Sequence, residues 1–146
     1  MTHSGAETVE RLVLDTSAYS HLMTGHTDVM DRIASASAIL MPIIVVGELE
    51  AAFAAGTRTH ENRASLEEFL AEAFVSVAPV TRSVAHRYGE LFGQLRRAGT
   101  PIPVNDIWIA AIAIELGGEL LTFDRDFARV PGLLSVVLQA DPPSAG

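Results

Sequence analysis

The sequence predicts an α/β protein, a three-layer α/β/α sandwich around a central, mostly parallel β-sheet. Short apolar runs that suit buried strands alternate along the chain with segments of helical length and periodicity, and this alternation is typical of a parallel sheet covered by helices. The chain has 146 residues, enough for one domain with a single core. It has no cysteine, so disulfides, thiolate metal sites and a cysteine nucleophile are excluded.

The first half of the chain has two predicted strands and four predicted helices. In order, we expect a strand over residues 11–14, helices over 17–23 and 28–36, a strand over 38–42, and helices over 42–56 and 57–74. The segment PIIVVGELEAAFAAG is ambiguous, because IIVV favours a strand whereas the residues up to Ala55 favour a helix. We expect a helix, with Pro42 in its first turn and Gly56 as its C-terminal cap.

The second half has three predicted strands and two helices. We expect a strand over residues 75–80, a helix from the N-cap Thr81 to Ala98 closed by Gly99, a helix that starts with NDIWIAA and stops at the glycines 117–118, and strands over 119–124 and 135–138. The domain should extend over residues 11–139, between a disordered lead (1–10) and a flexible tail (140–146). The most apolar segments are well short of the ~20 residues that cross a bilayer, so we expect a soluble, cytoplasmic protein without membrane contact.

The charge distribution excludes several classes of site. The net charge is −8, and all ten basic residues are arginines. A chain without lysine lacks the P-loop lysine, the Schiff-base lysine and the lysine of many aspartate enzymes that handle phosphate. Its acidity argues against binding nucleic acid by bulk charge but is compatible with a nuclease that recruits cations.

Four carboxylates fall where a site is expected. In parallel α/β sheets the site lies outside the carboxyl ends of the strands, where Asp15 follows the first strand and Asp124 follows ELLTF. Asp106 opens a helix that is apolar on all sides, and the helix dipole stabilises a carboxylate there. Glu48 lies within an apolar stripe of the helix after Pro42.

Each carboxylate also has an ordinary structural interpretation. Asp15 and Asp106 could be helix caps, Glu48 a residue at a solvated helix edge, Asp124 a turn residue, and Asp126 a cap or an arginine partner. If the four carboxylates converge, however, they repel one another unless a divalent cation neutralises them, and hard oxygen ligands suit Mg²⁺ or Mn²⁺. Such a site is suited to metal-assisted hydrolysis of a phosphodiester.

Three segments carry a family resemblance: LVLDTSAY, VVGELEAAF and IPVNDIWIAAIAIELGGELLTFDRDFARVPGL. Their order and spacing resemble the PIN domain, and in particular the VapC-type toxins of bacterial toxin–antitoxin pairs. The resemblance covers the chain from Leu12 to about Leu138. Its most specific part is the block from Pro103 to Leu133 together with the LDTS start.

The resemblance implies an Mg²⁺- or Mn²⁺-dependent endoribonuclease whose products carry 5′-phosphate and 3′-hydroxyl ends. Asp15, Glu48, Asp106 and Asp124 match the acidic site residues of the family. Asp15, Asp106 and Asp124 would supply most metal contacts, and Glu48 would position a second metal or the attacking water. The matching supporting positions are Thr16, Ser17, Asn105, Thr122 and Asp126. We also expect Thr16 or Ser17 to cap the helix after the first strand.

The resemblance also implies partners. These are an RNA substrate, a VapB-like antitoxin whose extended segment wraps the domain, and a second copy in a homodimer. For RNA contacts we expect Arg96 and Arg97, although surface ion pairing is the commoner role of such residues. For the antitoxin we expect a groove with apolar residues of the short helices after Asp15, such as Tyr19, Leu22, Met23 and Met30, although each of these could instead pack in the core.

Two other functions compete with this interpretation. A metal-dependent phosphatase of the haloacid-dehalogenase type also starts with an aspartate at a strand end, but it needs a second acid two residues later, where this chain has Ser17. A non-catalytic acidic domain, such as a phosphoacceptor receiver, needs a lysine near its end. The absence of lysine counts against both.

Overall fold

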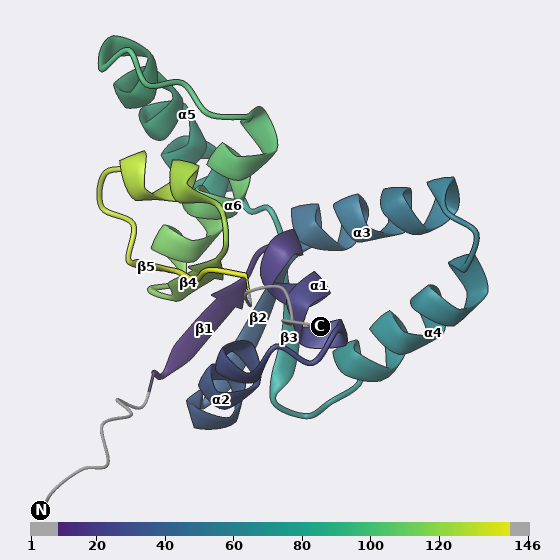
Figure 1. The fold of residues 1–146 in the computed structure, drawn as a ribbon. Coiled ribbons are helices and arrows are strands. Elements are labelled where there is room, and N and C mark those ends of the chain that lie inside the picture. Colours follow the sequence, from purple (N-terminus) through teal and green to yellow (C-terminus); the bar gives the residue numbers. More distant parts are fainter. Residues whose placement is uncertain (1–8, 141–146) are drawn as a thin grey trace, which may run out of the picture.

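The computed structural model describes residues 9–140 of the chain (Figure 1). The predicted tail beyond Ala140 and most of the predicted lead lie outside these residues. Val9 and Glu10, which we had assigned to the lead, are held in place, because their carbonyl oxygens accept hydrogen bonds of 3.0 Å from the backbone N–H groups of Ser37 and Ala38. These two residues are therefore part of the fold although they precede the first strand.

A five-stranded, fully parallel sheet forms the centre of the fold, in the order β3-β2-β1-β4-β5. The strands are β1 (Arg11–Leu14), β2 (Ala38–Pro42), β3 (Val75–Ala78), β4 (Glu119–Thr122) and β5 (Ser135–Val137). β1 is the central strand, and Leu12, Val13 and Leu14 are buried. A continuous apolar run is what a parallel strand covered on both faces requires.

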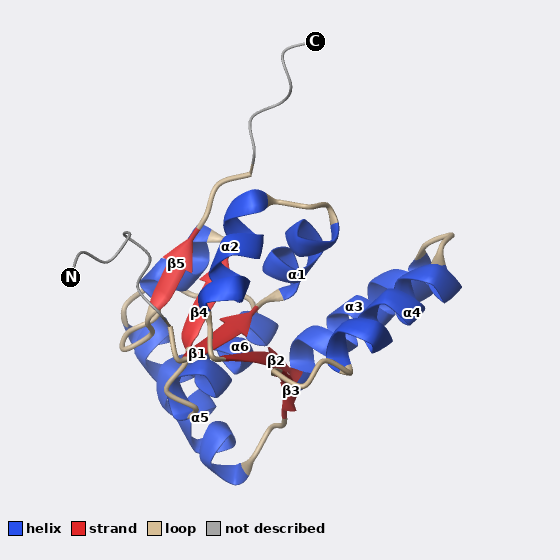
Figure 2. Ribbon diagram, turned by 90° about the horizontal axis from the view of Figure 1, so that it is seen from below, coloured by secondary structure: helices blue, strands red, loops and turns tan. Residues whose placement is uncertain are grey.

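Helices cover both faces of this sheet. They are α1 (Thr16–Met23), α2 (Thr27–Ser35), α3 (Ile43–Ala55), α4 (Thr59–Leu70), α5 (Arg82–Arg97) and α6 (Val104–Glu115), with a short 3-10 helix η1 (Arg125–Arg129). In Figure 2, α1 and α2 lie on one face and α5 and α6 on the other, while α3 and α4 form a hairpin that extends beside α1. The predicted three-layer α/β class is confirmed.

The strand order fixes where a site can form. From β1 the chain moves outward to β2 and β3, then returns through α5 and α6 to place β4 on the other side of β1. In open parallel sheets, a reversal of this kind leaves a crevice at the carboxyl ends of the two strands that flank it. The crevice therefore lies beyond Leu14 and Thr122.

Some predicted boundaries differ from the structure. Pro42 ends β2 and is the N-cap of α3 instead of lying in its first turn. α4 ends at Leu70 instead of residue 74, because the chain turns there and Val75 donates to the carbonyl of Glu72 before entering β3. The helix η1 was not predicted. None of the helices in residues 9–140 is both long and apolar enough to span a bilayer.

Candidate active site

Asp15 lies at the carboxyl end of β1 and is 5% exposed. Its Oδ1 accepts hydrogen bonds from Ser17 Oγ at 2.7 Å and from the Ala18 N–H at 2.8 Å, and its Oδ2 accepts one from Thr122 Oγ1. Asp15 itself is thus the N-cap of α1, and our expectation that Thr16 or Ser17 is the cap was wrong. As the cap of α1, Asp15 still lies at the carboxyl edge of the sheet. Its interpretations as a helix cap and as a site residue are therefore compatible.

Two hydroxyl groups join the ends of β1 and β4. Thr122 Oγ1, which donates to Asp15, accepts the Asp124 N–H at 3.0 Å. Ser17 Oγ, which also donates to Asp15, accepts the Phe123 N–H at 3.0 Å. The two strand ends are therefore held together through the Asp15 carboxylate.

Asp124 and Asp126 lie at the start of η1. Asp124 Oδ1 caps this helix by accepting the Asp126 N–H at 2.9 Å. Asp126 forms an ion pair with Arg129 at 3.2 Å. The turn role considered for Asp124 and the arginine pairing considered for Asp126 are both present in the structure.

Glu48 reaches the crevice from α3. Its Oε1 accepts a hydrogen bond from Thr16 Oγ1 at 2.7 Å, and its Oε2 accepts one from Asn105 Nδ2 at 3.4 Å. Glu50 lies elsewhere on the same helix and pairs with Arg63 at 3.0 Å. Only Glu48 is thus connected to both α1 and α6.

Asp106 lies in the first turn of α6, which begins after the N-cap Pro103, so Asp106 is not the cap. Within residues 9–140, no hydrogen bond or ion pair holds its carboxylate. Burial is the main cause that raises the pKa of Asp106, and together with the negative charges of Asp124, Glu48, Asp15 and Asp126 it brings this pKa to about 7. The five carboxylates are thus close enough to act on one another.

Burial also raises the pKa of Asp15, and the charge of Asp124 acts in the same direction. The hydrogen bonds from Thr122, Ser17 and the Ala18 N–H oppose this increase by favouring the ionised form. The balance is a raised pKa, because the effect of burial outweighs the three hydrogen bonds.

The residues present fit a hard divalent cation. The donors are carboxylates with hydroxyl and amide neighbours, and in the part of the chain that the structure describes no arginine or histidine pairs with Asp15, Glu48, Asp106 or Asp124. Among residues 9–140, no three Asp, Glu or His side chains are already arranged to hold a metal ion. The acids therefore lie near one another without forming a preformed three-ligand metal site.

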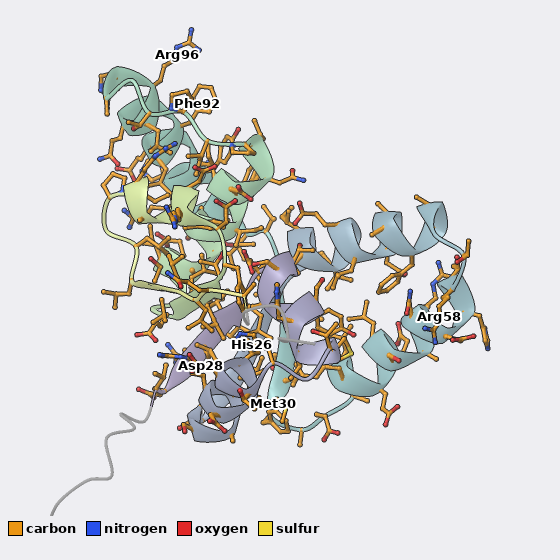
Figure 3. All side chains as sticks on the ribbon, viewed as in Figure 1. His26, Asp28, Met30, Arg58, Phe92 and Arg96 are labelled. Atoms are coloured by element: carbon orange, nitrogen blue, oxygen red, sulfur yellow. The ribbon has the colours of Figure 1, made fainter. Side chains whose placement is uncertain are left out.

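The exposed arginines include the two that we expect to contact RNA. Arg96 and Arg97 are exposed in the last turn of α5, and Figure 3 shows Arg96 at the outer tip of that helix. Arg125, which follows Asp124 directly, was missed. It is exposed and, within the described residues, forms no hydrogen bond or ion pair. Its position next to a candidate acid was the available signal in the sequence.

The chain is similar to known proteins in sequence and in fold. A family model described as the PIN domain matches residues 12–133. Ribonuclease VapC4 of Mycobacterium tuberculosis is 31% identical over 125 residues, covering 84% of this chain and 93% of the relative. Ribonuclease VapC5 of the same organism is 27% identical over 124 residues, with 85% and 90% coverage.

Solved structures share the fold. A structure of VapBC2 from Rickettsia felis, bound to a DNA fragment from its promoter, superposes with a TM-score of 0.79 at 23% identity, covering 88% of this chain and 99% of that one. A DNA-bound VapBC from Salmonella typhimurium also has a TM-score of 0.79, at 24% identity with 88% and 98% coverage. At this identity the likeness concerns the fold alone.

Proposed function

The chain belongs to the PIN domain family, and on that premise we propose that it is a VapC-type toxin, an endoribonuclease that hydrolyses RNA with the help of Mg²⁺, for which Mn²⁺ can substitute. One observation carries this proposal more than any other. Asp106 on α6 is surrounded by carboxylates from the end of β1, from α3 and from the end of β4, without a pairing arginine or histidine in the described residues, and its burial together with these charges raises its pKa to about 7. A divalent cation is the charge that such a site lacks.

Asp15, Asp106 and Asp124 are the residues that would hold the cation. When bound there, a divalent cation acts as a Lewis acid towards the phosphodiester and lowers the pKa of water. Ser17 and Thr122 keep both oxygens of Asp15 in place through their hydrogen bonds. Thr122 also fixes the Asp124 backbone, so one hydroxyl orients two of the three proposed ligands.

Glu48 has a separate role in the proposal. Thr16 and Asn105 each hold one of its oxygens, which leaves the carboxylate positioned between α1 and α6. A carboxylate fixed in this way can orient the attacking water and accept its proton. Asp106, which has no hydrogen bond in the described residues, keeps both oxygens available.

The partner is a VapB-type antitoxin, as in the VapBC complexes that share this fold. Met23 and Met30 are 47% and 44% exposed and remain candidates for the surface it covers. Tyr19 is 2% exposed and packs edge-on against Phe69 at 5.6 Å, so it belongs to the core and not to the expected groove. We further propose a homodimer in the cytoplasm.

Cleavage assays test the function directly. The protein is incubated with labelled RNA and, separately, with a chromogenic phosphate monoester, each with Mg²⁺, Mn²⁺ or EDTA. The proposal expects RNA cleavage that requires the cation and leaves the monoester intact. Hydrolysis of the monoester would favour the phosphatase alternative, and inactivity towards both substrates would favour a non-catalytic domain.

A further inference from the structure

A hollow of about 620 Å³ opens beside the candidate active site. Its lining includes His21 from α1, Phe123 from the end of β4, Arg125 from η1, and Val137 and Leu138 at the end of β5. Phe123 and Arg125 flank Asp124 in the chain. No role assigned above uses this hollow.

A pair of stacked rings forms one part of the wall. The rings of His21 and Phe123 lie 3.8 Å apart between centroids and within 14° of parallel. The buried His26 contacts both rings edge-on, at 5.6 Å from His21 and 5.1 Å from Phe123. His26 is itself fixed, because its Nδ1 accepts the Val29 N–H and its Nε2 lies 3.1 Å from the carbonyl oxygen of Gln139. The stacked pair is therefore supported from within the fold.

Hydrogen bonds connect this ring pair to Asp15. The Phe123 N–H donates to Ser17 Oγ, which donates in turn to Asp15 Oδ1. His21 Nδ1 lies 2.9 Å from the carbonyl oxygen of Ser17, and since a carbonyl only accepts, Nδ1 carries the proton. Nε2 is then the atom of His21 that remains for a ligand. Both rings are thus positioned by the residue that also holds the proposed metal ligand.

Arg125 adds a positive charge to this wall. Within the described residues its guanidinium has no ion pair, whereas Arg129 on the same helix is paired with Asp126. Arg125 is exposed and directly follows Asp124. An unpaired arginine next to a cluster of acids in a chain of net charge −8 is a local site for a phosphate.

We propose that the hollow binds one nucleobase of the RNA next to the bond that is cut, with the base on the His21–Phe123 pair and Arg125 on the adjoining phosphate. This inference rests on the proposed ribonuclease function. It adds a base-binding site that selects the nucleotide at one position beside the cut. Flat rings that accept a base, combined with a cation for the backbone, are the elements that bind single-stranded nucleic acid. They favour RNA over a protein segment as the occupant.

Matched variants test the proposal on random-sequence labelled RNA in excess Mn²⁺. Phe123→Leu is compared with Phe74→Leu, which changes an exposed phenylalanine directly before β3. Arg125→Gln is compared with Arg82→Gln, which changes another exposed arginine without a partner in the described residues. We measure kcat and KM and sequence the new RNA ends.

Phe123→Leu should raise KM on the order of 10-fold, more than it lowers kcat, and it should weaken the nucleotide preference at one position beside the cut. Arg125→Gln should raise KM and weaken its dependence on salt.

Each other outcome has a defined meaning. If both site variants keep the wild-type KM within twofold and the wild-type preference, the base-binding inference is overturned. If, in addition, the two site variants no longer retain the co-expressed antitoxin, the hollow binds a protein segment instead of an RNA base. If the wild-type chain cuts no RNA, the proposed ribonuclease function is wrong, and the base-binding inference, which rests on it, is wrong with it. Arg125 is exposed, so its variant keeps the test decisive if Phe123→Leu does not fold.

Discussion

Thr122 donates a hydrogen bond to Asp15 across 107 residues of sequence, and both residues are buried. The same hydroxyl oxygen accepts the backbone N–H of Asp124. One side chain on β4 therefore orients the acid at the end of β1 and the acid that follows β4. In this arrangement the parallel pairing of β1 and β4 sets the spacing of two proposed metal ligands.

Thr122→Val is expected to weaken both the fold and cation binding. The substitution removes a donor to Asp15 and an acceptor for Asp124, at a cost of about 1–3 kcal/mol of unfolding free energy. Denaturant unfolding and calorimetric titration with Mn²⁺ measure the two effects. Thr122→Ser keeps the hydroxyl and should restore most of both. Equal cation affinity in the valine and serine variants would contradict the orienting role.

The four carboxylates should be required for RNA cleavage but not for folding. Loss of a residue that supports a metal ligand costs about 10–100-fold in activity, so loss of a proposed ligand should cost about 100-fold or more. The variants are Asp15→Asn, Glu48→Gln, Asp106→Asn and Asp124→Asn. Asp126→Asn should do less harm, because Asp126 is paired with Arg129. Asp31→Asn, on the exposed surface of α2, is the control. Wild-type rates in the Asp106 variant would exclude it from the site.

The pKa of Asp106 predicts how metal-free stability depends on pH. Because its pKa is about 7 in the folded chain, against an ordinary value of 3.8, the folded state binds more protons between these values. The stability that the protonated carboxyl provides is therefore lost as pH rises from about 4 to about 7. In EDTA, the Tm of Asp106→Asn should match the wild type at pH 4 and exceed it increasingly up to pH 7. A difference that does not vary with pH would contradict the raised pKa.

The order of elements could be predicted from the sequence because local patterns determine it. The continuous apolar run of β1, the buried apolar helix α6 and the Thr81 cap of α5, which accepts the Val84 N–H at 3.2 Å, are each decided by residues close in the chain. The rule for parallel sheets predicted Asp15 and Asp124 at one edge, whereas Asp106 and Glu48 were candidates from their places on two apolar helices. The family resemblance then added their roles.

The features that could not be predicted depend on contacts between distant segments. The bond from Thr16 to Glu48 spans 32 residues, and the stack of His21 on Phe123 joins α1 to the end of β4. Neither leaves a periodic pattern in the sequence. For Arg125 the sequence offered only its position next to Asp124, and its place in the wall of the hollow became visible only in the structure. Local composition likewise did not predict the short helix η1 that follows Asp124.

Two glycines of the domain should respond oppositely to alanine. A Cβ on Gly118 would lie 2.6 Å from Cγ2 of Val13 on the central strand, whereas a Cβ on Gly47 in α3 meets nothing within 4 Å. Gly118→Ala should therefore destabilise the fold by about 1–3 kcal/mol. Gly47→Ala should stabilise it by about 0.5–1 kcal/mol through helix propensity. Denaturant unfolding measures the change in unfolding free energy of both variants. Equal changes would contradict the close contact between Gly118, which joins α6 to β4, and Val13 on β1.

Cation binding should release protons near neutral pH. With a pKa of about 7, Asp106 is about half protonated at pH 7, and a divalent cation binds only the ionised form. Calorimetric titration with Mn²⁺ in two buffers of different ionisation enthalpy gives the number of protons released. At pH 7 we expect roughly half a proton from Asp106, falling towards zero at pH 9. Asp106→Asn should abolish most of this release while the control Asp31→Asn retains it. Tight Mn²⁺ binding without proton release at pH 7 would place the cation away from Asp106.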